Sequence, residues 1–158
     1  MKRPSAPYVG AVLLMLIGAA DVARARDIAR PALSIDHAWL RPAAAGGGDA
    51  GYLRIVNHGK TADWLVGATT PIAAGASLHE SRMAGQVMTM RQVRALVIAP
   101  GSAVTLAPRG FHLMFEGLRR PVRLGQSVPV VLTFARAGRV TVRFVARTQY
   151  PAQPMPGM

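Results

Sequence analysis

The chain has 158 residues, of which 51% are hydrophobic and 16% are charged. This length and composition are typical of one globular domain with its own core, and they exclude a wholly disordered chain. The formal net charge is +12, but the arginines stand mostly alone rather than in runs or helical stripes. That distribution argues against a nucleic-acid-binding protein.

The first 25 residues have the pattern of a secretory signal peptide. Lys2 and Arg3 give a positive start, and an apolar run of about 12 residues follows over 9–20. A membrane-spanning helix needs roughly 20 residues, so we expect no stable membrane insertion. The sequence Ala-Arg-Ala at 23–25 fits a signal peptidase site, and cleavage after Ala20 is the alternative. We therefore expect an exported, periplasmic protein.

Short segments of alternating polarity, separated by turn residues, follow the signal peptide. This pattern is typical of a β-sandwich or β-barrel, so we predict an all-β single domain over residues 26–149 and a flexible tail over 150–158. A single helical turn over 71–76 is left open. The predicted strands are residues 34–40, 50–57, 63–69, 76–82, 87–93, 102–107, 111–116, 128–135 and 139–147.

The sequence contains no cysteine. This excludes disulfides, thiolate nucleophiles, lipid attachment through cysteine, and a blue-copper electron-transfer site, which needs a thiolate. Methionine thioether is the only soft donor left, and the chain has 8 methionines.

Two separate regions carry soft and imidazole donors. In the predicted strand 111–116, alternation turns Phe111, Leu113 and Phe115 inward and puts His112 and Met114 on the outward face. These two side chains are about 6 to 7 Å apart along the strand, close enough to converge on one ion.

The second region contains His79, Met83, Met88 and Met90 on either side of a predicted turn at 84–85. A hairpin there brings His79 back towards Met88 and Met90. Met83 is either a core residue or a spare donor. A pair of donors from each region gives two imidazole nitrogens and two thioether sulfurs. Such neutral, soft ligands favour Cu(I) over zinc, calcium or Cu(II).

Catalysis is not expected from this sequence. The few carboxylates form no acid pair and no serine–histidine–aspartate pattern, so we predict that the protein is not an enzyme. Glu80 follows His79 in sequence, but alternation turns it away, and we expect it at the surface in a role unrelated to the site. His37 and His58 are interpreted as structural or surface residues.

The spacing of the donors resembles that of the PCuAC family of periplasmic copper chaperones, whose signature is His, ten residues, Met, twenty-one residues, His, one residue, Met. His79, Met90, His112 and Met114 match it at all four positions, and the likeness covers about residues 35–146. The resemblance implies a cupredoxin-like fold with these four residues binding Cu(I) in a shallow, solvent-accessible site. It also implies delivery of copper to a cytochrome c oxidase subunit or its assembly factor. We expect a monomer.

Three points stay open at this stage. Met88 competes with Met90 as a ligand, although the spacing favours Met90. Some PCuAC relatives bind a second copper through a His- and Met-rich tail, whereas the tail here has Met155 and Met158 but no histidine. The alternative function is a cationic periplasmic module that binds anionic lipid or polysaccharide.

Overall fold

The computed structural model describes residues 32–148, and every regular element in that range is a β-strand. The strands are β1 (Leu33–Leu40), β2 (Asp49–Asn57), β3 (Asp63–Thr69), β4 (Ala73–Ala84), β5 (Val87–Gln92), β6 (Leu96–Ile98), β7 (Ala103–Leu106), β8 (Phe111–Leu118), β9 (Ser127–Phe134) and β10 (Gly138–Ala146). The all-β prediction is confirmed. The predicted signal peptide and tail fall outside the described residues, and the range 32–148 contains no helix with the length and hydropathy to cross a bilayer.

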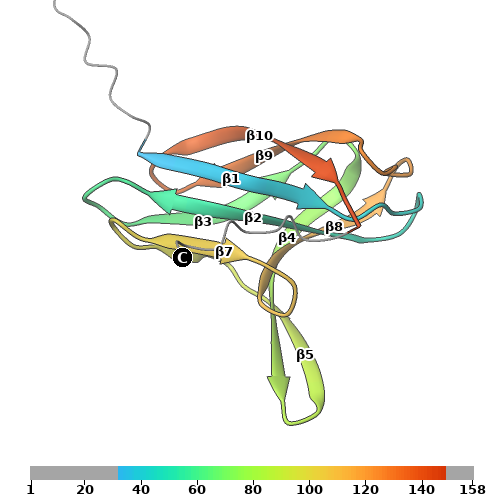
Figure 1. Cartoon of the computed structure of the whole chain (residues 1–158), viewed down its shortest axis with the longest axis horizontal. Helices are drawn as coiled ribbons and strands as arrows, with labels where there is room; N and C mark the ends of the chain where they lie inside the picture. The colour runs from blue at the N-terminus through green and yellow to red at the C-terminus, as the bar shows by residue number, and fades with distance from the viewer. Residues whose placement is uncertain (1–31, 149–158) are drawn as a thin grey trace, which may run out of the picture.

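All ten strands belong to one curled sheet (Figure 1). Its order is β5-β4-β8-β2-β1-β10-β9-β3-β6, and β7 pairs with β2 beside the main path. The strands β1 and β10 run parallel, and the remaining described pairs are antiparallel. The sheet folds over one core, so that Phe115 of β8 meets Phe144 of β10 edge to face, with ring centroids 6.2 Å apart.

The structure differs from the predicted strands in two places. The strand β4 begins at Ala73, so the helical turn left open over 71–76 does not form. The strand β6, which pairs with β3 through Leu96–Ile98, was not among the predicted strands. A strand of three residues is too short to show alternation, and only its two buried ends, Leu96 and Ile98, mark it.

The strands β4 and β5 form a hairpin that extends beyond the body of the sheet (Figure 1). Its turn lies between the last pair, Ala84 and Val87, and Gly85 adopts a φ of +65° there. A positive φ at this position is required in tight two-residue hairpin turns and suits glycine. All six residues of β5 are exposed, so the hairpin has little core of its own.

The close approach of β2 to the core depends on Gly51. A Cβ atom at this position would lie 2.7 Å from Cε2 of Phe115 and 3.1 Å from Cε1 of Phe144. Both rings are buried and pack against each other, so neither has free space into which it could move.

We therefore expect Gly51→Ala to lower the free energy of unfolding by roughly 1 to 3 kcal/mol, the usual cost of overpacking a core. Gly67→Ala is the matched control in β3, because no atom lies within 4 Å of its added Cβ. Urea denaturation followed by circular dichroism measures both. Equal stability of the two variants would contradict this packing argument.

Asp49, at the start of β2, is a buried carboxyl with incomplete hydrogen bonding. It is 5% exposed. Its Oδ1 accepts a hydrogen bond from the Ala50 amide at 2.7 Å, whereas its Oδ2 has no partner among the described residues. Burial raises the pKa of Asp49 to about 6, although the Ala50 amide and the nearby Arg41 act to lower it.

Because the pKa of Asp49 is higher in the folded chain than in the unfolded chain, the folded state is favoured at low pH and loses stability as pH rises from about 4 to 7. Asp49→Asn removes this dependence. We expect its stability relative to the parent protein to increase across that interval by about 1 to 3 kcal/mol. Denaturation at pH 4.5 and 7.5 tests the prediction, and parallel profiles for the two proteins would refute it.

Candidate metal centre

The register of three neighbouring strands puts the predicted donors on one face of the sheet. His79 of β4 lies directly opposite His112 of β8, and their ring centroids are 5.9 Å apart. On the other side of β4, Gln92 of β5 is opposite His79. The two imidazoles, which are separated by 32 residues of sequence, are therefore direct neighbours.

The thioethers lie on the same face, in rows on either side of the histidines. Met114 follows His112 by two residues and pairs with Ser77. On β5, Met90 is opposite Ser81, and Met88 is opposite Met83. Since side chains two residues apart share a face, all of these methionines point to the side of the sheet that carries the histidines.

An open pocket of about 360 Å³ lies between the hairpin and β8. Its walls include Met88, Met90, His112 and Met114, which are donors from both predicted regions. His79 does not line this pocket but borders it through its contact with the His112 ring. The strands β5 and β8 thus bring Met90, His112 and Met114 to one concave surface, and His79 lies beside it.

His112 is more enclosed than its position on the outward strand face suggested. It is only 4% exposed, because the ring of Tyr52 from β2 lies beside it at a centroid distance of 6.4 Å. Its Nδ1 lies 3.0 Å from the Gly110 carbonyl. A carbonyl can only accept, so Nδ1 carries the proton and Nε2 of the neutral ring has a free lone pair.

His79 is partly buried and has one ring nitrogen without a partner. Its Nε2 lies 2.9 Å from Oγ of Ser77, and its buried Nδ1 has no hydrogen-bond partner within the described part of the chain. When Nε2–H donates to the serine, the lone pair of Nδ1 is left unsatisfied. A buried polar atom in this condition is uncommon and fits a metal ligand.

Arginine, not carboxylate, supplies the charge around the pocket. Arg41 and Arg109 line it together with Tyr52, and the guanidinium carbon of Arg41 lies 6.0 Å from the Tyr52 ring centroid. Within residues 32–148, no three His, Cys, Asp or Glu side chains converge. A cation held here would depend on neutral donors, and the nearby positive charge disfavours a divalent ion over a monovalent one.

Neither Arg109 nor Tyr52 was predicted from the sequence to lie at the site. Arg109 sits in the Pro-Arg-Gly turn before β8 with a φ of +69°, a conformation that is uncommon for a residue other than glycine. The turn itself was visible in the sequence, but nothing in the sequence indicated that it borders the pocket. Tyr52 likewise had no distinguishing signal within its strand.

The expectation that Glu80 lies at the surface is wrong. Alternation does turn it away from His79, but it is 6% exposed rather than a surface residue. Its Oε1 accepts a bond from Nε of Arg82 at 2.7 Å, and its Oε2 accepts bonds from Nε and Nη2 of Arg91 at 2.9 and 2.7 Å. The hydrogen bond from Arg82, followed by that from Arg91, holds the pKa of Glu80 below its usual value. Glu80 therefore links β4 to β5 on the opposite side of the hairpin from the donor face, which is the face that carries His79 and Met90.

The remaining histidines lie apart from this face. His58 is hydrogen-bonded to Oγ of Ser34 at 2.9 Å, and His37 is exposed with a φ of +53° at an irregularity of β1. Their interpretation as structural or surface residues agrees with these positions. Met155 and Met158 lie outside the described residues.

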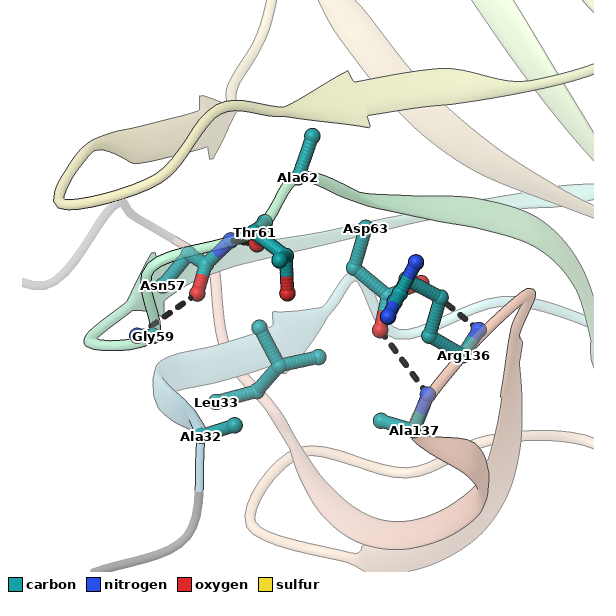
Figure 2. Close-up of a pocket in the computed structure, with 9 residues that line it drawn as sticks. All are labelled: Ala32, Leu33, Asn57, Gly59, Thr61, Ala62, Asp63, Arg136 and Ala137. Carbon is teal, nitrogen blue, oxygen red and sulfur yellow. Dashed lines mark hydrogen bonds between the residues drawn. The ribbon is translucent and has the colours of Figure 1, made fainter.

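A second pocket, of about 170 Å³, lies between the β2–β3 loop, the β9–β10 turn and the start of β1 (Figure 2). Asp63 accepts bonds there from the amides of Arg136 and Ala137, both at 2.9 Å. Asn57 donates to the carbonyls of Thr61 and Ile98. The Asp63 and Asn57 side chains therefore use their polar atoms to join loops.

Comparison with known proteins identifies relatives for most of the chain. A family model described as "Putative lipoprotein LpqE-like" matches residues 33–146. A protein of Leifsonia xyli subsp. xyli named "Putative lipoprotein Lxx21020" is 34% identical over 135 residues, which cover 82% of this chain and 81% of the relative. This chain lacks the cysteine to which a lipid could be attached.

Solved structures of PCuAC domains share the fold. The copper-bound PCuAC domain from PmoF2 matches with a TM-score of 0.64 and 25% identity, over 75% of this chain and 94% of that domain. The solution structure of CuI-DR1885 from Deinococcus radiodurans matches with a TM-score of 0.56 and 30% identity, over 78% of this chain and 85% of that one. The cupredoxin-like, single-domain fold is confirmed. By the extent of the family match and the identity to the Leifsonia relative, this protein belongs to the LpqE-like family.

Proposed function

We propose that this protein is a copper chaperone that binds Cu(I) outside the cytoplasm through His79, Met90, His112 and Met114. It releases the ion to a copper-accepting protein without any bond-making chemistry on a substrate. The expected acceptor is a cytochrome c oxidase subunit or a factor that assembles its copper centre. Export through the predicted signal peptide is part of this proposal, and the lipoprotein relatives support it.

The observation that carries the proposal is the direct pairing of the two histidines within reach of the thioethers. His79 and His112 are cross-strand neighbours, and Met90 and Met114 line the adjoining pocket. Met90 is two register pairs from the row of His79 and Met88 is four pairs from it, which favours Met90 as the ligand. The fold match to copper-bound PCuAC structures supports copper as the ion.

The chemistry of the donors favours the reduced ion. Thioether sulfur and neutral imidazole leave Cu(I) with its single charge, and thioether is a soft ligand suited to Cu(I). The adjacent Arg41 and Arg109 add to the cost of a second positive charge. An exposed ligand such as Met90, which is 54% exposed, can leave while an incoming ligand binds, so transfer can proceed by stepwise exchange.

Replacing each proposed ligand with alanine is expected to weaken Cu(I) binding by about 100-fold or more, since even changing a residue that only hydrogen-bonds to a metal ligand costs about 10- to 100-fold. The variants are His79→Ala, His112→Ala, Met90→Ala and Met114→Ala. Competition with a colorimetric Cu(I) chelator under anaerobic conditions measures the affinity. X-ray absorption of the loaded protein is expected to show two nitrogen and two sulfur neighbours.

His58→Ala is the matched control, because the His58 ring is hydrogen-bonded to Ser34 and lies outside the pocket. Circular dichroism verifies that each variant is folded. Parent-like Cu(I) affinity in folded His79→Ala and Met114→Ala would refute the proposed site. An equal loss on changing Met88 and Met90 separately would refute the preference for Met90.

Glu80 is expected to hold Met90 in position, because it joins β4 to Arg91, the residue next to Met90 on β5. Glu80→Gln removes the charge that binds Arg82 and Arg91 and should reduce Cu(I) affinity by roughly three- to tenfold. The loss should disappear when the same change is made in a Met90→Ala background, since coupled residues are not additive. Asp36→Asn, which alters an exposed ion pair with Arg54, is the control. An additive loss in the double variant would show that Glu80 acts by another route.

A further inference from the structure

Met83 and Met88 are a pair of soft donors outside the four proposed ligands. They are directly opposite each other on β4 and β5, one pair before the turn. Directly opposed side chains share a face, and their Cβ atoms lie about 4.5 to 5.5 Å apart. Two flexible thioethers at this separation can bring both sulfurs to one ion without a change in the backbone.

Neither side chain is needed to fill the core. Met83 is 57% exposed and Met88 is 52% exposed, whereas methionine is among the residues most often buried. The described core cluster is built from leucine, isoleucine, valine, phenylalanine and alanine, and neither methionine belongs to it. The pair therefore exposes apolar surface at a hairpin end where solubility alone would favour polar residues.

We propose that Met83 and Met88 form a second, weaker site for a soft monovalent cation, Cu(I) or its analogue Ag(I). Two neutral thioethers match the preference of such ions for sulfur. Harder divalent ions prefer nitrogen or oxygen ligands, which this pair does not supply. The site needs no change in the oxidation state of the ion.

The position of the pair suits it to pass copper to the main site, which is the proposed site of His79, Met90, His112 and Met114. Met90 follows Met88 by two residues on the same face, and both line the pocket that contains His112. Adjacent rows along a strand are about 6 to 7 Å apart, a step that long thioether side chains can bridge. An ion bound at the hairpin end can therefore pass to Met90 by exchange of one sulfur for another. This loading role rests on the proposed function, whereas the binding of a second cation does not.

The test is an anaerobic Cu(I) titration of protein labelled with ¹³C at the methionine methyl groups. Each methyl signal is assigned by replacing one methionine with leucine. The first equivalent is expected to shift the signals of Met90 and Met114, and further Cu(I) is expected to shift those of Met83 and Met88 together. In Met83→Leu the first equivalent should bind as before, and the affinity for the second should fall by about tenfold or more. Leucine preserves the apolar surface, so the change isolates the sulfur.

A double variant, Met83→Leu with Val87→Met, keeps the number of methionines constant. Val87 is exposed, and its side chain points to the opposite face of the hairpin from Met88. The relocated thioether should therefore fail to restore the second site. Restoration would mean that sulfur content alone determines binding, and it would overturn the proposed pairing.

The outcomes separate this inference from the proposed function. If Met90 and Met114 respond but Met83 and Met88 do not move at any copper ratio, the second site is refuted and the main site stands. If Met83 and Met88 respond together while Met90 and Met114 do not, the second site stands and the proposed ligand set is refuted. Faster or unchanged loading of the main site in Met83→Leu, measured by stopped flow, would refute the loading role.

Discussion

The pairing register of β4 with its two neighbours is the constraint on which the candidate site depends. One antiparallel register sets His79 opposite His112, and the other sets Ser81 opposite Met90. A shift of either register by one residue would send the donors of that strand to the other face of the sheet. The Gly85 turn fixes the register of β4 with β5, and the packing of β8 in the core fixes the register of β4 with β8. Backbone pairing therefore determines which candidate donor side chains share this face.

Alternation in the sequence predicted which side chains share a face, but it could not predict what covers that face. His112 and Met114 were correctly placed together, yet His112 is enclosed by Tyr52, which comes from a strand some 60 residues earlier. Glu80 was correctly turned away from His79, yet it is buried because Arg82 and Arg91 close over it. Each error concerns a contact made through tertiary folding, which local periodicity does not contain.

The choice between Met88 and Met90 also depends on a contact that local sequence does not determine, namely the register of the β4–β5 hairpin. A turn near residues 84–85 permits either methionine to return towards His79. The observed pairing of Ala84 with Val87 sets Met90 nearer to the histidines than Met88 and puts Met88 opposite Met83. Motif spacing favoured the same residue by resemblance, whereas the register supplies a physical reason. The short β6 was missed because three residues carry no periodic signal.

The two sides of the candidate site differ in burial, and this difference bears on the order of events in the proposed copper exchange. His112 lies on a core strand, is nearly inaccessible and has its ring oriented by the Gly110 carbonyl. Met90 lies on a hairpin whose second strand is fully exposed and which is tied behind the donor face by Glu80. Segments with few buried contacts open at lower free energy than core strands. We therefore expect an acceptor to displace the hairpin thioether first, while the imidazole of His112 retains the ion until the incoming ligands have replaced the others.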